Sequence, residues 1–185
     1  MLLKDNKLSN ENKLSTKKIA LVGILSAIAV IAVYFESILP VNKLTLFALS
    51  SFLVSIIVIE AGIKASFLFY TVTSLLMFIV IPKKTSLIPY ALFFGYYGIF
   101  KYYVEKIKIL IPKILLKQLF FNICFYIIYQ IFGNIFFPDF LLNIEFPFYI
   151  IAIICQFIFI LYDYVYTLFI SYYRDKIRGK LKLGN

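Results

Sequence analysis

Polar side chains recur at helical spacing inside the two most C-terminal apolar runs of the chain. They repeat at steps of four residues in the first run and at steps of seven in the second, so each set shares one helix face. The first set is Asn122, Tyr126, Gln130 and Asn134, and the second is Tyr149, Gln156 and Asp163. Such groups are costly to expose to lipid. They predict either a ligand pocket or hydrogen bonds that join helices.

The side chains that most catalytic and metal sites need are missing from the sequence. It has no His, and its two cysteines, Cys124 and Cys155, lie inside apolar runs, where we interpret them as small core residues. A phosphate-binding G-x-x-x-x-G-K-[ST] loop is also absent, so the chain cannot hydrolyse ATP in that manner. Tyr162-Asp163 resembles half of an intramembrane aspartyl protease site, but the second aspartate is absent. We expect no enzyme, no metal and no cofactor.

The composition is typical of a membrane protein. The 185 residues are 63% hydrophobic, whereas soluble domains are about half apolar, and the mean hydropathy is +0.94. A membrane span needs about 20 mostly apolar residues. Six runs approach that length, and the loops between them are too short for a separate soluble domain.

The apolar runs set the predicted organisation, an all-α membrane protein with a six-transmembrane-helix bundle. All six prolines lie at or between run ends, where a helix can begin or stop. We expect a six-helix domain over residues 19–173 between two cytoplasmic basic tails, 1–18 and 174–185. The predicted spans are Ile19–Leu39, Leu44–Gly62, Ala65–Ile81, Ser86–Glu105, about Leu116–Phe137 and about Phe146–Tyr173.

The basic residues predict the orientation of these spans. With both termini inside, the inner segments hold sixteen Lys and Arg residues and the outer segments three. The positive-inside rule therefore favours an N-in/C-in topology. The net charge of +10 comes from residues that flank apolar runs, so we expect contact with membrane lipid and no nucleic-acid partner.

Six polar residues share one depth in the outer half of this topology. They are Glu36, Tyr90, Gln130, Asn134, Tyr149 and Gln156. We interpret them as ligand-binding residues of a pocket open to the outside, and the alternative is that they only pack helices together. Asp163 lies deeper, so we expect it to affect folding more than binding.

Small residues occupy two opposite faces of the first span. Ala29, Ala32 and Glu36 lie on one side of that helix, whereas Ala20, Gly23 and Ala27 lie on the other. Small residues let membrane helices approach closely. The second set is either a partner-binding face or a second internal contact, and the sequence leaves both possibilities open.

Together these features resemble the substrate-binding S components of energy-coupling factor (ECF) transporters, which are bacterial vitamin importers. The resemblance rests on the length, the six spans, both ends inside, and a first span that opens KKIALVGILSAIAVIA after a lysine-rich tail. It implies a multi-pass protein of the bacterial plasma membrane that binds a small molecule from outside. It also implies partners, namely ATPase subunits and a membrane-embedded T component. The T component contacts an Ala-x-x-x-Ala motif in the family, which matches Gly23 and Ala27 with Gly in place of the first Ala.

Two other functions fit the same spans. A structural or scaffolding membrane protein of a cell-envelope complex would use the intramembrane polar residues only for helix packing. A small autonomous transporter would need no ATPase partner. Recovery of the chain with two ATPases and a T-like protein distinguishes the first hypothesis from both alternatives.

Overall fold

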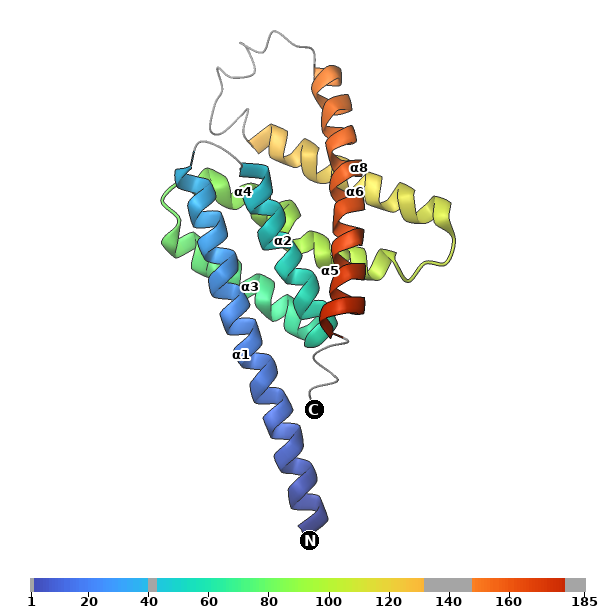
Figure 1. The fold of residues 1–185 in the computed structure, drawn as a ribbon. Coiled ribbons are helices and arrows are strands. Elements are labelled where there is room, and N and C mark those ends of the chain that lie inside the picture. The colour runs from blue at the N-terminus through green and yellow to red at the C-terminus, as the bar shows by residue number, and fades with distance from the viewer. Residues whose placement is uncertain (1, 40–42, 132–147, 179–185) are drawn as a thin grey trace.

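The computed structural model describes residues 2–39, 43–131 and 148–178, and these ranges contain helices and no strand (Figure 1). The predicted all-α membrane bundle is thereby confirmed. The elements are α1 (Leu2–Ile38), α2 (Lys43–Glu60), α3 (Ile63–Val80), η1 (Lys84–Ser86), α4 (Leu87–Pro89), η2 (Tyr90–Phe94), α5 (Gly95–Val104), α6 (Leu110–Ile131), α8 (Phe148–Tyr172) and η4 (Tyr173–Arg178).

Five of the described helical segments are long and apolar enough to cross a membrane, so this is a multi-pass membrane protein. They are Thr16–Ile38, Lys43–Glu60, Ile63–Val80, Leu110–Ile131 and Ala152–Lys176. The predicted fourth span, Ser86–Glu105, is helical without a break from Leu87 to Val104, through α4, η2 and α5. Its middle piece, η2, is a π-helical turn.

The first three helices pack closely because small side chains lie between them. Ala29 and Ser50 are fully buried at 0% exposure, next to the apolar side chains of Val33 and Val54. The Ser50 hydroxyl is satisfied within its own helix, since Ser50 Oγ donates to the Phe47 carbonyl at 2.7 Å, whereas the buried Ser26 Oγ has no hydrogen-bond partner among the described residues. This local bonding lets polar residues occupy a core without a partner on another helix.

Helix α1 buries one of its two small-residue faces. Ala29, Ala32 and Glu36 are buried, whereas Ala20 and Ala27 are exposed. Gly23 is also exposed, and a Cβ built there would meet no atom within 4 Å. Helix α1 also continues as a helix through the N-terminal residues expected to form a tail, and Figure 1 shows this part extending beyond the bundle.

Helix α5 approaches α2 and α8 at a glycine. A Cβ built on Gly98 would lie 2.5 Å from Tyr166 Oη and 3.0 Å from Val54 Cγ1, so only glycine fits between these side chains. Gly62, with φ of 90°, lies in the connection between α2 and α3, where the left-handed backbone favours glycine. Both glycines are needed for the chain to reverse or cross at these points.

The other half of the bundle is built by α6 and α8 around aromatic residues. Its buried core contains Phe93, Tyr97, Phe159 and Tyr166 together with Cys124. In Figure 1, α6 runs across the direction of α8, which stands along the bundle. Helix α6 begins at Leu110, which is earlier than the predicted start at Leu116, and it accommodates Pro112 in its first turn.

Candidate functional site

A half-open apolar cavity of about 620 Å³ lies between α2, η2, α6 and α8, and its lining includes exposed residues such as Leu44 (59%) and Leu161 (63%). None of the described residues that line it carries a charge. The lining residues are Leu44, Thr45, Leu46, Ala48, Leu49, Phe52, Phe93, Phe94, Phe121, Cys124, Phe125, Ile128, Cys155, Ile158, Phe159, Leu161, Tyr162 and Val165. Cavities of this size and make-up are typical of small-molecule sites.

Aromatic rings from different elements pack against one another around the cavity. The ring centroids of Phe93 and Phe121 are 5.7 Å apart, and those of Phe121 and Phe159 are 4.5 Å apart. Phe94 meets Tyr162 edge-on at 5.7 Å. Rings of this size keep the helix backbones apart, so a hollow remains where the side chains do not meet.

Few polar atoms belong to the cavity lining. The Tyr162 hydroxyl donates to Ser51 Oγ at 2.8 Å, which ties α8 to α2. The Cys124 thiol donates to the Leu92 carbonyl at 3.3 Å, which ties α6 to η2. Cys155 also lines the cavity, so both cysteines of the chain face the same hollow. These groups can give a ligand at most a few orienting hydrogen bonds.

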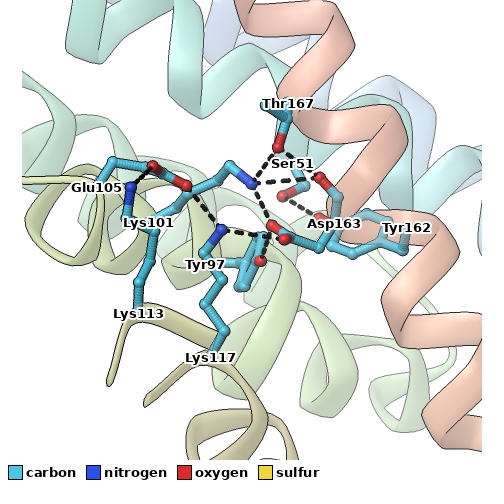
Figure 2. A network of polar contacts seen from close by, with 9 residues as sticks. All are labelled: Ser51, Tyr97, Lys101, Glu105, Lys113, Lys117, Tyr162, Asp163 and Thr167. Carbon is cyan, nitrogen blue, oxygen red and sulfur yellow. Dashed lines mark hydrogen bonds and ion pairs between the residues drawn. The ribbon is translucent and has the colours of Figure 1, made fainter. Parts of the chain in front are cut away.

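A cluster of three lysines and two carboxylates joins α5, α6 and α8 beside the cavity; we call it the ion cluster. It consists of Lys101, Glu105, Lys113, Lys117 and Asp163. Figure 2 shows Lys101 and Lys117 pointing toward the Asp163 carboxylate from two different helices. Lys101 binds this carboxylate and the Thr167 hydroxyl, whose Oγ1 is 2.8 Å from Nζ. Lys117 Nζ lies 3.0 Å from Asp163 Oδ2 and 2.7 Å from Glu105 Oε1.

Every ammonium group of the ion cluster has a carboxylate partner. Lys113 Nζ lies 2.9 Å from Glu105 Oε2, and Lys101, only 1% exposed, is paired with Asp163. Glu105 lies in the turn after α5, where burial would raise its pKa. The bonds from Lys113 and Lys117 outweigh that effect and lower the pKa of this carboxyl, so it stays ionised. Pairing of this kind is what a buried charge requires.

Two neighbouring residues of α8 separate the cavity from the ion cluster. Tyr162 lines the cavity, whereas Asp163 binds the lysines. The Tyr97 ring lies against the Tyr162 ring with centroids 5.3 Å apart, and its hydroxyl donates to Asp163 Oδ1 at 2.5 Å. The Tyr162 ring thus faces the cavity, and the Tyr97 hydroxyl faces the charged groups of the ion cluster.

The predicted ligand-binding residues occupy several separate places. Tyr90 is fully buried beside α3, with its hydroxyl 2.8 Å from Thr73 Oγ1. Glu36 is 3% exposed on α1, and its buried Oε2 has no hydrogen-bond partner in the described structure. Gln130, near the end of α6, donates to the Tyr126 hydroxyl at 2.9 Å.

Gln156 lies in a different hollow, of about 260 Å³, which it shares with Asn122 between α6 and α8. Asn134 lies outside the described residues, and the side chain of Tyr149 is not among those described. None of the four predicted residues with a described side chain lines the larger cavity.

Sequence reasoning missed the apolar wall and the partners of Asp163. The wall residues look like ordinary lipid-facing or core residues, because ring type alone does not show which rings leave a gap. Lys101 and Lys117 were assigned to the inner, lysine-rich segments. The sequence does contain a signal for the Lys101–Asp163 pair. Both residues lie within apolar stretches, where a charged side chain needs a partner of opposite charge.

Comparison with known proteins found no matching family model, no similar curated protein and no similar solved structure. Two features of the described residues bear on function, namely the cavity and the ion cluster. The cavity can hold a small ligand, and it offers that ligand aromatic surface and few hydrogen bonds. The ion cluster is internally paired and can hold three helices in register.

Proposed function

We propose that this chain is the membrane-embedded, substrate-binding subunit of a micronutrient importer of the ECF type. It binds a small, vitamin-like molecule from the outside of a bacterial plasma membrane. A partner complex supplies ATP hydrolysis, since the chain has no phosphate-binding loop of its own. The protein itself catalyses no reaction in this proposal.

The cavity is the observation that carries the proposal. Its volume of about 620 Å³ falls inside the range of roughly 300–1,000 Å³ that small-molecule sites occupy. On α2 its lining begins at Leu44 and ends at Phe52, in the half of the helix that the N-in topology assigns to the outside. A binding subunit of an importer needs a site with this location.

The exposed small-residue face of α1 supports the partner part of the proposal. Ala20, Gly23 and Ala27 lie on the surface of the bundle, with open space around Gly23. A helix of another membrane protein can approach this face to within backbone contact. In the proposal that protein is the T component, which links the chain to two ATPase subunits.

Affinity purification of the full chain from its native membranes tests this function. We expect recovery of one further multi-span protein and two ATPases, and we expect Ala27→Leu to reduce that recovery at least tenfold while the isolated chain stays folded. Ala29→Leu is the matched control, because Ala29 is fully buried and its enlargement disturbs the chain itself. Purification without any ATPase would contradict the proposal, and so would unfolding caused by Ala27→Leu.

The orientation is tested separately, since an inverted protein would present the cavity to the cytoplasm. In a background without native cysteines, Lys83→Cys should react with an impermeant maleimide in intact cells, and Lys106→Cys should not. Both positions are exposed in the structure, so accessibility within the fold does not decide the result. Labelling at position 106 alone would reverse the topology and refute uptake from outside.

A further inference from the structure

We infer that the ligand of the cavity is an uncharged aromatic molecule with few polar groups; this inference rests on the proposed function and narrows its substrate class. The first argument is electrostatic. The described lining has no Asp, Glu, Lys or Arg, so a charged ligand would leave water without a counter-charge. Burying an unpaired charge is so unfavourable that such a ligand would bind poorly.

The charges nearest the cavity do not supply that counter-charge. Lys101 and Lys117 both bind Asp163, and Lys117 also binds Glu105. Of the two tyrosines beside this carboxylate, Tyr162 lines the cavity, and Tyr97 packs against the Tyr162 ring with its hydroxyl directed at Asp163. A ligand would have to displace this tyrosine pair and break an ion pair to reach any of these groups.

The second argument is the composition of the wall. Seven aromatic side chains line the cavity, and they come from all four surrounding elements. They are Phe52, Phe93, Phe94, Phe121, Phe125, Phe159 and Tyr162. Aromatic side chains prefer edge-to-face or offset contacts with other rings, and several of these residues already contact one another in this way. A ring-containing ligand continues that arrangement.

The third argument distinguishes an aromatic ligand from a lipid tail, which is the other apolar molecule at hand. A lipid tail would gain nothing from ring geometry, whereas a ring-containing ligand can stack on the six phenylalanines and Tyr162 of the lining. The lining also holds seven large aliphatic side chains, so the aromatic residues, and not the apolar surface as such, favour a ring over a lipid tail. These aliphatic residues are Leu44, Leu46, Leu49, Ile128, Ile158, Leu161 and Val165. The Tyr162 hydroxyl oxygen, a donor to Ser51, can still accept one hydrogen bond from a ligand.

The two native cysteines provide the experiment, because both line the cavity. The full-length protein in lipid nanodiscs is treated with N-ethylmaleimide, and the labelling rate is measured by mass spectrometry. Neutral 2-naphthol and anionic 2-naphthoate are compared as probes of similar shape. At roughly ten times its Kd, a bound probe should slow labelling about tenfold, because about a tenth of the sites remain free. We expect this protection from 2-naphthol and less than twofold protection from 2-naphthoate.

Two variants separate binding in the cavity from partition into the lipid. Ala48→Phe fills the cavity and should abolish protection by 2-naphthol. A Leu75→Cys reporter in a background without native cysteines lies at a 60% exposed position on α3, away from the cavity, and should show no protection. Equal protection by 2-naphthoate would overturn the inference. So would absence of protection together with a phospholipid acyl chain recovered from the cavity.

Failure of this inference is distinguishable from failure of the proposed function. If the chain co-purifies with ATPases but both probes protect its cysteines equally well, the proposed importer function is supported and only the proposed ligand class is wrong. If no ATPase is recovered, the importer function is refuted, even if 2-naphthol protects the cysteines. The two experiments share no readout, so each result applies to one proposal.

Discussion

Helices α1, α2 and α3 pack through small residues, whereas α6 and α8 pack through aromatic rings. The membrane-crossing segment of α1 has 39% of its residues buried within the chain, and that of α8 has 11%. Ala29 and Ser50 lie at 0% exposure on the first side, where backbones come close. On the second side the rings of Phe121 and Phe159 keep the helices apart and leave a cavity.

The difference shows how one small bundle can combine a closely packed part with a hollowed part. Close backbone approach maximises dispersion contacts, which hold membrane helices together without a hydrophobic effect between them. Ring packing yields fewer such contacts, and the ion cluster compensates by fixing α6 and α8 to α5 through paired charges. Regions that bind ligands are commonly the less tightly packed parts of a protein.

The largest effect should come from Asp163, which holds the loosely packed half to α5. Asp163→Asn leaves Lys101 buried at 1% exposure without its carboxylate, and removing one partner of a buried pair costs about 3–5 kcal/mol. We expect a fall of about 3 kcal/mol in the free energy of unfolding in micelles, because Asp163 keeps 22% side-chain exposure.

Lys113→Met is the control for Asp163→Asn. Its partner Glu105 is 37% exposed, so we expect a loss below about 1 kcal/mol. The double change Lys101→Met with Asp163→Leu should recover much of the stability, since it removes both charges of that pair and leaves Lys117 bound to Glu105. Equal losses from Asp163→Asn and Lys113→Met would show that the ion cluster does not hold the second half together.

A matched pair of alanines tests the packing difference directly. Ala29 is fully buried between helices, so Ala29→Leu should destabilise the protein by about 1–3 kcal/mol through overpacking. Ala48 faces the cavity, so Ala48→Leu should cost less than about 0.5 kcal/mol or stabilise the fold by filling space. Denaturant unfolding of both variants measures the difference. Similar losses at the two positions would mean that the second half is as tightly packed as the first.

A smaller loss than those of Asp163→Asn and Ala29→Leu should come from removing the hydrogen bond that joins the two halves at the cavity. Tyr162→Phe removes the bond from its hydroxyl to Ser51 Oγ, and a single neutral hydrogen bond is worth about 0.5–1.5 kcal/mol. Binding of 2-naphthol should survive in this variant, because the ring remains. Ser51→Ala should give the same loss, and a double variant should lose little more. Additive losses would show that each hydroxyl has another partner.

The sequence predicted the helices well because hydropathy and proline position act locally. Five predicted spans correspond to long apolar helices, and Pro82 follows the end of α3 as expected for a terminator. The predicted fourth span is also one unbroken helical segment, but the sequence did not predict the π-helical turn within it at Tyr90–Phe94. Nothing in the run of apolar residues marks that change, which depends on packing with neighbouring helices.

The candidate site was much less predictable. Residues such as Gln156 and Tyr90 were predicted to bind the ligand because a polar residue inside an apolar run can be recognised from the sequence. In the structure these two residues lie in different places. The cavity arises from the relative placement of α2, η2, α6 and α8, and helix placement is a tertiary property. Phe121 and Phe125, which line it, cannot be told from core residues by type or spacing.

The π-helical turn at Tyr90–Phe94 has a consequence for how this chain can change during evolution. Such a turn holds one residue more than an α-helical turn, and each residue rotates a helix by about 100°. Loss of a single codon there would convert the turn to a regular helix and turn Tyr97 and Lys101 away from Asp163. The reading frame would be kept, but the contacts of α5 would not. Substitutions can therefore accumulate in this segment far more readily than insertions or deletions.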